Sequence, residues 1–286
     1  MALAAPGSTE HVLMQRLSYL SDSVLDTRDG DELEGSVLQR LAITYRTATN
    51  DVLKSYAFRP SLMWNQFYNG AQEDAQEFMQ NLLDPASAPE LYTVTRGLNR
   101  PRLICPHPSC NAFKKVAGED PFSMLQIDID NQTSLQEAVQ CFLRTQEPVQ
   151  VNQENNVCSK CEREIQPLKQ HHIEAYPEVL ILHLKRFKTV YQGRGQEALQ
   201  QYLRHRVVCE ETIHLNGVPY HQVARVYHVG ESLRSGHYFT ICKHVTPSGN
   251  WWYYNDSMRR LERVDDDLNA SSRVYLCVYE RAQDTS

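Results

Sequence analysis

Pro177-Glu-Val-Leu-Ile-Leu-His-Leu-Lys-Arg-Phe187 is the stretch that decides how this chain folds. Apolar and β-branched residues fill it from Val179 to Leu184, which is typical of a β-strand. Four further strand-like runs follow it, at residues 220–227, 237–243, 251–254 and 274–279. The last third of the chain is therefore predicted to form an antiparallel sheet.

The chain before this sheet changes character near residue 91. After that point the pattern consists of short alternating runs, such as residues 125–130, followed by a predicted helix over residues 134–144. Before it, apolar residues recur at helical spacing over residues 11–25, 37–56, 62–67 and 72–83. The N-terminal third is therefore predicted to be helical, and the middle third to combine strands with one helix.

Two of the predicted helices, over residues 72–83 and 134–144, have a clear apolar face. The expected inward residues are Ala75, Phe78, Met79 and Leu82 in the first helix, and Leu135, Ala138, Val139 and Phe142 in the second. Cys141, on the second helix, is predicted to be an ordinary core cysteine. Residues 191–201 contain glycine and several glutamines and are predicted to form a loop.

Half of a catalytic site lies in the predicted sheet. Ser235-Gly236-His237-Tyr238 is followed, after a short turn, by an aromatic run that ends in Asn255-Asp256. We expect an imidazole Nδ1–H to contact Asn255 or Asp256, because a hairpin brings the two strands together. The alternative is a hydrogen-bonded core histidine. The pattern favours acyl transfer by a cysteine or a serine, whose nucleophile would lie far away in sequence.

The eight cysteines include two close pairs. Cys105 and Cys110 are separated by four residues, and Cys158 and Cys161 by two. In a chain without a secretion signal, such pairs favour a structural zinc site of four thiolates over disulfides. Two alternatives remain: His107 replaces one sulfur ligand, or the cysteines are merely small buried or exposed residues.

Composition and charge limit the partners and the location that we expect. With 286 residues, 41% of them hydrophobic, the chain can bury a substantial core. Its net charge of −6 argues against nucleic acid and suits a basic or mixed-charge protein partner. No run is apolar for the roughly 20 residues that a membrane span needs, and the start does not resemble a signal peptide. We therefore expect a cytoplasmic or nuclear protein without a membrane partner.

Four blocks of this sequence resemble, in the right order, the ubiquitin-specific proteases, which are papain-like deubiquitinases. They are residues 72–78, the two cysteine pairs, residues 177–187, and residues 235–238 with 252–256. The resemblance implies an α+β, papain-like cysteine protease fold shaped as a hand. A helical thumb would span residues 1–92, zinc-tipped β fingers 93–168 and an antiparallel β palm 169–286, all within one catalytic domain.

The resemblance also implies roles for individual residues. His237 matches the general base, Asn255 the residue that orients it, and Asp256 an auxiliary acid. Gln72, Asp74 and Tyr238 match positions that line the cleft for the C-terminal tail of ubiquitin. Because that tail contains arginine and ends in two glycines, the carboxylate of Asp74 is expected to pair with an arginine. The implied partner is ubiquitin or a ubiquitinated protein.

The sequence departs from the family at the nucleophile. Members of the family carry Gly-Asn-Thr-Cys-Tyr at the start of the first thumb helix, and this chain has no cysteine before Cys105. Ser8 fills the matching position, and a serine hydroxyl in a cysteine protease site is a poor nucleophile. We therefore expect this polypeptide to be inactive, either because the nucleophile segment has been lost from it or because it is a pseudoenzyme that binds ubiquitin or a scaffold partner without cleavage.

Overall fold

A computed structural model describes residues 73–85, 89–110, 112–115, 119–149, 157–191, 198–232, 235–243, 251–255, 258–264 and 266–282. The helices expected at 11–25, 37–56 and 62–67 lie outside these residues, as do Ser8, Gln72 and Asp256. None of the helices within the described ranges has the length and apolar character that a bilayer crossing requires.

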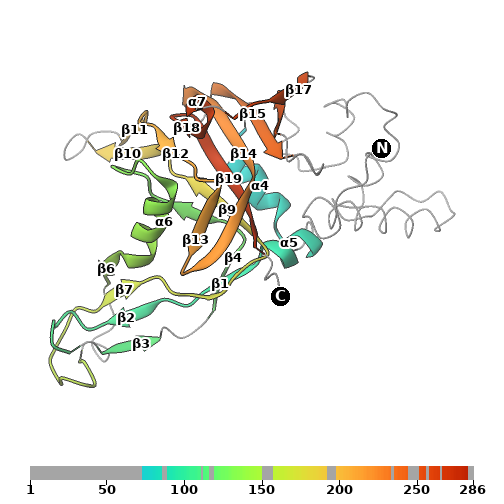
Figure 1. The fold of residues 1–286 in the computed structure, drawn as a ribbon. Coiled ribbons are helices and arrows are strands. Elements are labelled where there is room, and N and C mark those ends of the chain that lie inside the picture. Colours follow the sequence, from blue (N-terminus) through green and yellow to red (C-terminus); the bar gives the residue numbers. More distant parts are fainter. Residues whose placement is uncertain are drawn as a thin grey trace, which may run out of the picture.

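The largest element is a twisted sheet of eight strands (Figure 1). In spatial order its strands are β17 (Met258–Glu262), β16 (Trp251–Asn255), β15 (Ser235–Lys243), β14 (Val218–Ser232), β19 (Val274–Arg281), β9 (Val179–Leu184) and β5 (Leu125–Ile127), with β13 (Thr212–Leu215) pairing β14 beside this path. All of its pairings are antiparallel except β5 with β9. The predicted antiparallel sheet is therefore confirmed, and a strand from the middle of the chain extends it in parallel.

Smaller sheets extend away from this one or cover its edges. The sheet at the lower left of Figure 1 has four strands, in the order β3 (Phe113–Lys115), β2 (Arg102–Ile104), β7 (Leu168–Gln170) and β6 (Gln146–Pro148). A three-stranded sheet joins β4 (Asp120–Phe122), β1 (Gly97–Asn99) and β8 (Ile173–Ala175). Two-stranded pairs join β10 (Phe187–Tyr191) to β11 (Ala198–Tyr202), and β12 (Val207–Val208) to β18 (Ala270–Ser271).

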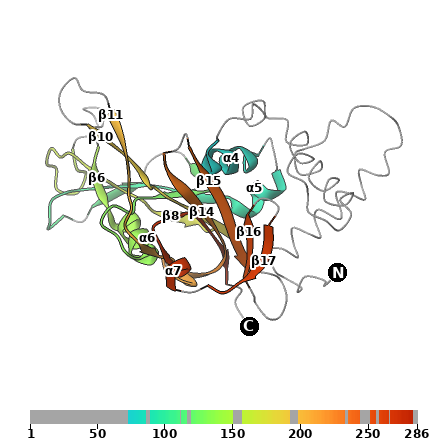
Figure 2. The ribbon, with the colours of Figure 1, turned by 90° about the horizontal axis from the view of Figure 1, so that it is seen from above.

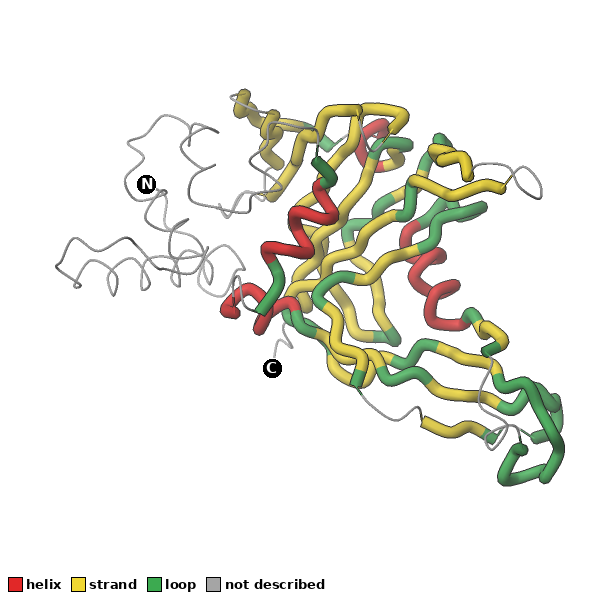
Figure 3. Tube along the Cα trace, turned by 180° about the vertical axis from the view of Figure 1, so that it is seen from behind, coloured by secondary structure: helices red, strands yellow, loops and turns green. Residues whose placement is uncertain are grey.

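Helices cover both faces of the large sheet. They are α4 (Ala75–Leu82), α5 (Pro89–Thr95), α6 (Leu135–Arg144) and the short α7 (Asp266–Asn269). Figures 2 and 3 show α4 and α5 on one side of the sheet and α6 on the other. The fold is thus α+β, as predicted.

This arrangement explains the apolar run of β9. Every residue from Val179 to Leu184 is buried, because β9 lies between two helical layers. Leu180, Leu182 and Leu184 belong to the main core on the α6 side, whereas Val179 and Ile181 pack with residues of α4 and α5. Side chains alternate between the faces of a strand, so His183 points to the same side as Val179 and Ile181.

The two predicted amphipathic helices form, with small differences. Each has a capped start: Asp74 accepts hydrogen bonds at the N-terminus of α4, and Ser134 does so at α6. Cys141 is exposed, so its prediction as a core cysteine was wrong; Leu143, one turn after the buried Val139, is buried instead. The predicted loop over residues 191–201 was also partly wrong, because Ala198–Tyr202 forms strand β11 against β10.

Candidate active site

His237 and Asn255 lie together on one face of the large sheet. The register that pairs Thr240 of β15 with Tyr254 of β16 puts Asn255 opposite Phe239, which shares a face with His237. Diagonal neighbours of this kind in an antiparallel pair are close enough for long side chains to meet. Nε2 of His237 is hydrogen-bonded to Oδ1 of Asn255. The hairpin therefore brings these residues together, as the sequence predicted.

The ring nitrogen in this contact differs from the prediction. We expected Nδ1 to contact Asn255 or Asp256, but the contact uses Nε2, and Asp256 lies outside the described residues. Because a carboxamide oxygen can only accept, this contact assigns the imidazole hydrogen to Nε2. Nδ1 is then the nitrogen whose lone pair can receive a proton, which is the tautomer that a general base requires.

Three packed aromatic residues hold the side chain of Asn255 in place. Its Nδ2 donates to the hydroxyl of Tyr253 at 2.8 Å, so both ends of the amide are fixed. The ring of Tyr253 packs on Phe239 with centroids 5.1 Å apart, and Phe239 stacks on Tyr227 at 4.6 Å. The sequence analysis did not assign Tyr253 a role. Tyr253 stands two residues before Asn255 and therefore on the same face of the strand. This spacing is the sequence signal that could have identified it as a partner of Asn255.

The glycine before His237 leaves room for a side chain of the neighbouring strand. A Cβ built on Gly236 would lie 2.2 Å from Nε2 of His228, on strand β14. His228 is fully buried, and its ring lies 4.7 Å from that of Tyr238. The imidazole of His228 therefore fills the space that a side chain at position 236 would occupy.

Asp74 joins α4 to the large sheet through a single carboxylate. Its Oδ1 accepts from the backbone amides of Gln76 at 2.7 Å and Glu77 at 3.1 Å, which caps the helix. Its Oδ2 accepts from the hydroxyls of Tyr275 at 2.6 Å and Tyr238 at 3.3 Å. Burial, together with the negative charge of Asp74, raises the pKa of both tyrosines, so both hydroxyls remain donors. The structure thus places Tyr238 and Asp74 together, as expected.

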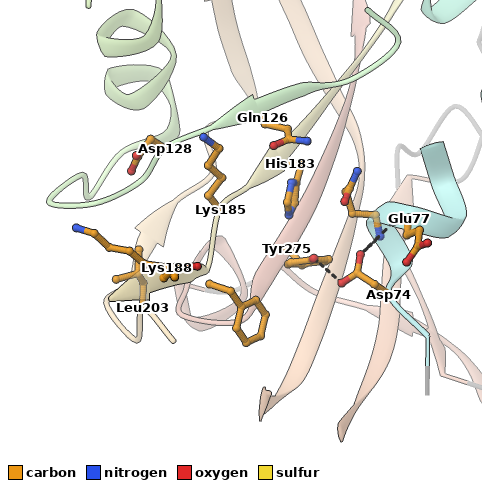
Figure 4. A pocket seen from close by; sticks show the side chains of 12 residues that line it. Asp74, Glu77, Gln126, Asp128, His183, Lys185, Lys188, Leu203 and Tyr275 are labelled. Carbon is orange, nitrogen blue, oxygen red and sulfur yellow. Dashed lines mark hydrogen bonds between the residues drawn. The ribbon is translucent and has the colours of Figure 1, made fainter. Parts of the chain in front are cut away.

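A pocket of about 570 Å³ opens beside this carboxylate, between α4 and strands of the large sheet. Figure 4 shows Asp74 and Glu77 on the wall that α4 supplies, with His183 and Tyr275 between them and the opposite wall. Lys185 and Lys188 lie on that opposite side. Asp74 and Glu77 therefore make the helical wall acidic, whereas Asp128 lies with the two lysines on the opposite side.

His183 is the unusual group in this pocket. It is 9% exposed, and neither ring nitrogen has a hydrogen-bond partner among the described residues. Its ring meets that of Tyr275 edge-on, with centroids 4.7 Å apart. Burial lowers the pKa of His183 to about 4, so the imidazole is neutral near pH 7. A buried neutral imidazole without a partner is costly for a folded protein and marks a place where a ligand group can bind.

The four predicted cysteine ligands converge at the end of the four-stranded sheet. Their sulfurs all lie within 4.8 Å of one another, with Cys110 and Cys158 3.6 Å apart and Cys105 and Cys161 3.8 Å apart. Tetrahedral zinc with bonds of about 2.3 Å places its sulfur ligands about 3.8 Å apart, so the spacing fits. His107 is not part of this cluster.

One thiol of this cluster favours the thiolate form that binds metal. Backbone amides of Cys161 and Lys160 lower the pKa of the Cys158 thiol to about 6, whereas burial raises the pKa of the Cys105 and Cys110 thiols. The ammonium of Lys160 donates to the carbonyl of Cys110 at 2.7 Å and so ties the two cysteine-bearing turns together.

The remaining cysteines do not join His237. Cys242 is on the same continuous strand as His237, five residues away, and so points to the opposite face. Cys209 and Cys277 are fully buried.

Comparison with known proteins agrees with this architecture. Residues 16–279 match the profile of a family described as "Ubiquitin carboxyl-terminal hydrolase". Ubiquitin carboxyl-terminal hydrolase 8 of Saccharomyces cerevisiae is 28% identical over 87% of this chain and 58% of its own length. Ubiquitin carboxyl-terminal hydrolase 42 of Homo sapiens is 28% identical over 76% of this chain and 17% of its own length. The chain therefore matches little more than half of the first relative and less of the second.

Solved structures of this kind share the fold. The SAGA Ubp8/Sgf11/Sus1/Sgf73 DUB module bound to ubiquitin aldehyde contains a chain that superposes with a TM-score of 0.73 at 23% identity, covering 98% of this chain and 69% of that one. A SAGA DUB module with a variant of Ubp8, bound to monoubiquitin, gives a TM-score of 0.72 at 24% identity, with the same coverage.

Proposed function

Because the chain belongs to the ubiquitin carboxyl-terminal hydrolase family, we propose that it binds the C-terminal tail of ubiquitin in the pocket between α4 and the large sheet. The pocket beside Asp74 is the observation that carries this proposal, since Asp74 and Glu77 line one of its walls and Asp74 also accepts a hydrogen bond from Tyr238, the residue after His237. An arginine-containing tail with two terminal glycines suits a narrow cleft of this charge. Gln72 and Tyr238 complete the proposed tail-binding set.

The hand-shaped division of the chain follows from the same proposal. Residues 1–92 would form the thumb, 93–168 the fingers and 169–286 the palm. The cluster of Cys105, Cys110, Cys158 and Cys161 would hold one structural zinc ion, which fixes the two turns at the fingertip where few apolar residues are buried. Within the palm, Asn255 would keep His237 in the tautomer of a general base, with Asp256 beside it. A cytoplasmic or nuclear location fits a ubiquitin-binding protein.

We further propose that this polypeptide binds ubiquitin without cleaving its conjugates. Hydrolysis in this family depends on a cysteine thiolate, and the matching position here is Ser8. His237 and Asn255 would then retain the geometry of the base without a thiol to activate. If a cysteine is supplied by another segment, the same pair would serve thiol-dependent hydrolysis of the isopeptide bond at the ubiquitin C-terminus.

Binding is tested by titrating the full chain with ubiquitin and with ubiquitin that lacks its tail. We expect intact ubiquitin to bind and the truncated form to bind at least tenfold more weakly, because only the tail reaches the pocket. Equal affinity for the two forms would place the ubiquitin contact elsewhere and refute the proposed site.

Catalysis is tested separately with ubiquitin that carries a thiol-reactive group at its C-terminus. We expect no covalent adduct with the wild-type chain or with Cys242→Ala. An adduct that forms with the wild type and is lost in Cys242→Ala would show an unconventional nucleophile and overturn the non-catalytic assignment. Hydrolysis of a ubiquitin conjugate by the chain alone would overturn it as well.

A further inference from the structure

The carboxylate of Asp74 has no unused acceptor position. A carboxylate offers about four lone pairs, and Asp74 receives two backbone amides on Oδ1 and two tyrosine hydroxyls on Oδ2. A new donor, such as an amide or guanidinium group of a bound peptide, can reach Asp74 only if one of these four leaves. The two amides belong to α4 and are fixed by the helix, so the exchange must involve a tyrosine.

The two tyrosines hold Oδ2 unequally. Tyr275 donates at 2.6 Å, is 2% exposed and lies on β19, which is paired on both sides by β14 and β9. Tyr238 donates at 3.3 Å, is only partly buried and lies on β15, directly after His237. Hydrogen bonds to a charged acceptor weaken as they lengthen, so Tyr275 is the stronger and more rigid partner.

The surroundings of Tyr275 hold its ring in place. His183 packs edge-on against it at 4.7 Å, His228 lies 6.0 Å away, and Phe187 lies 6.5 Å away, also edge-on. Neither imidazole has a hydrogen-bond partner among the described residues, so neither competes with Asp74 for the phenol hydrogen. Tyr275 therefore has one hydroxyl hydrogen and donates it to Asp74.

We propose that Tyr275 is a positioning residue that fixes Asp74, and with it the start of α4, at the pocket wall, and that the Tyr238 hydroxyl is the partner that leaves Oδ2 when a peptide donor arrives. This inference rests on the proposed binding of the ubiquitin tail in this pocket. Tyr275 then joins the sheet of the proposed palm to α4 of the proposed thumb. Tyr238, next to His237, is the residue whose hydrogen bond changes when a peptide occupies the pocket.

The test compares Tyr275→Phe and Tyr238→Phe with Tyr279→Phe, measuring ubiquitin affinity and amide hydrogen exchange in α4. Tyr279 is a matched control, because it is also buried on β19 and its hydroxyl accepts from the Gln222 side chain and donates to the carbonyl of Glu210, both at 3.0 Å. For Tyr275→Phe we expect roughly tenfold weaker binding and roughly tenfold faster exchange in α4, the effect of losing one charge-assisted hydrogen bond. Tyr238→Phe should lose less affinity than Tyr275→Phe, because the peptide donor displaces the Tyr238 hydroxyl from Asp74, and the Tyr279→Phe control should change neither quantity.

Asp74→Asn is a second variant that distinguishes loss of the Tyr275–Asp74 hydrogen bond from a general folding defect. Asn caps a helix as well as Asp, so Oδ1 can still hold α4, but the amide nitrogen that replaces Oδ2 cannot accept from Tyr275. Its effect on α4 exchange should match that of Tyr275→Phe, and exchange in the double variant should be no faster than in either single variant. Its loss of ubiquitin affinity should be larger, because it also removes the acceptor of the peptide donor. Additive increases in α4 exchange would refute the link, as would unchanged α4 exchange in Tyr275→Phe.

The two readouts separate this inference from the proposed function. If the wild-type chain does not bind ubiquitin, the function fails, while α4 exchange still decides whether Tyr275 fixes Asp74. If Tyr238→Phe loses as much affinity as Tyr275→Phe, the exchangeable role of Tyr238 is refuted even though ubiquitin binds.

Discussion

Gly236→Ala is expected to displace the strand that carries His237. The added methyl group would lie 2.2 Å from Nε2 and 2.9 Å from Cε1 of His228, closer than a Cβ can approach another heavy atom. His228 cannot move easily, because it is fully buried and rings of Tyr238 and Phe187 lie 4.7 and 5.8 Å from it. The strain must therefore shift β15 at its start, next to His237.

The cost follows from overpacking a closed site. Forcing one extra methyl group into a well-packed core costs about 1–3 kcal/mol. For a chain of 286 residues, that loss corresponds to a fall in Tm of roughly 2–5 °C. Removing the opposing ring should relieve the strain, so Gly236→Ala in a His228→Ala background should cost about 1–3 kcal/mol less than in the wild type.

Thermal unfolding of the wild type, Gly236→Ala, His228→Ala and the double variant measures the coupling between the two substitutions. Imidazole nitrogen NMR signals show whether the environment of His237 changes. Gly217→Ala is the control, because it has nothing within 4 Å of the added Cβ and only the strain of a backbone φ of +86°. It should lose roughly 1 kcal/mol without changing the His237 signals. Additive costs for Gly236→Ala and His228→Ala, within about 0.5 kcal/mol, would refute the steric argument.

Three further outcomes are expected. The wild type should contain one equivalent of zinc by metal analysis, and Cys158→Ser should lose it and accelerate hydrogen exchange in the four-stranded sheet; a metal-free protein with unchanged exchange would contradict the site. Burial depresses the pKa of His183 to about 4 from an unfolded value near 6.5, so its contribution to stability is complete above pH 6.5 and falls by up to about 3 kcal/mol as the pH drops through 4. Urea unfolding of His183→Gln should therefore show a shallower loss between these pH values than the wild type, and identical slopes would contradict the assignment. Asn255→Ala removes the acceptor for Nε2–H of His237, so nitrogen NMR should show a mixture of tautomers, whereas Asn255→Asp should retain the single tautomer.

The parts of this structure that the sequence predicts are those set by local pattern. The continuous apolar run of β9 and the helical spacing around α6 each require only neighbouring residues, and both elements form close to the expected limits. The contact between His237 and Asn255 is also local, since one hairpin carries both residues. The two cysteine pairs are recognisable because their internal spacing is itself a metal-binding signal.

What the sequence does not predict depends on register and packing between distant segments. The bond from Tyr275 to Asp74 joins residues about 200 positions apart, and nothing in either local pattern indicates it. The need for glycine at position 236 is of the same kind, because the group that requires it is an imidazole on the neighbouring strand. Cys141 was misplaced for a different reason: its residue type suggested a core position, although helical spacing puts it off the face that Leu135, Ala138, Val139 and Leu143 form.

Residues on one face of β9 have two different surroundings: Val179 and Ile181 pack in an apolar cluster, and His183 lines the pocket. Val179 and Ile181 face α4 and α5 and pack in an apolar cluster, and His183 is the next residue on that face. An aliphatic side chain there would extend the cluster, whereas a buried imidazole without a partner costs roughly 1–3 kcal/mol. Packing alone therefore disfavours histidine at this position. Because His183 also lines the pocket beside Tyr275, its two ring nitrogens lie where a group in the pocket can pair with them, which an aliphatic side chain would not allow.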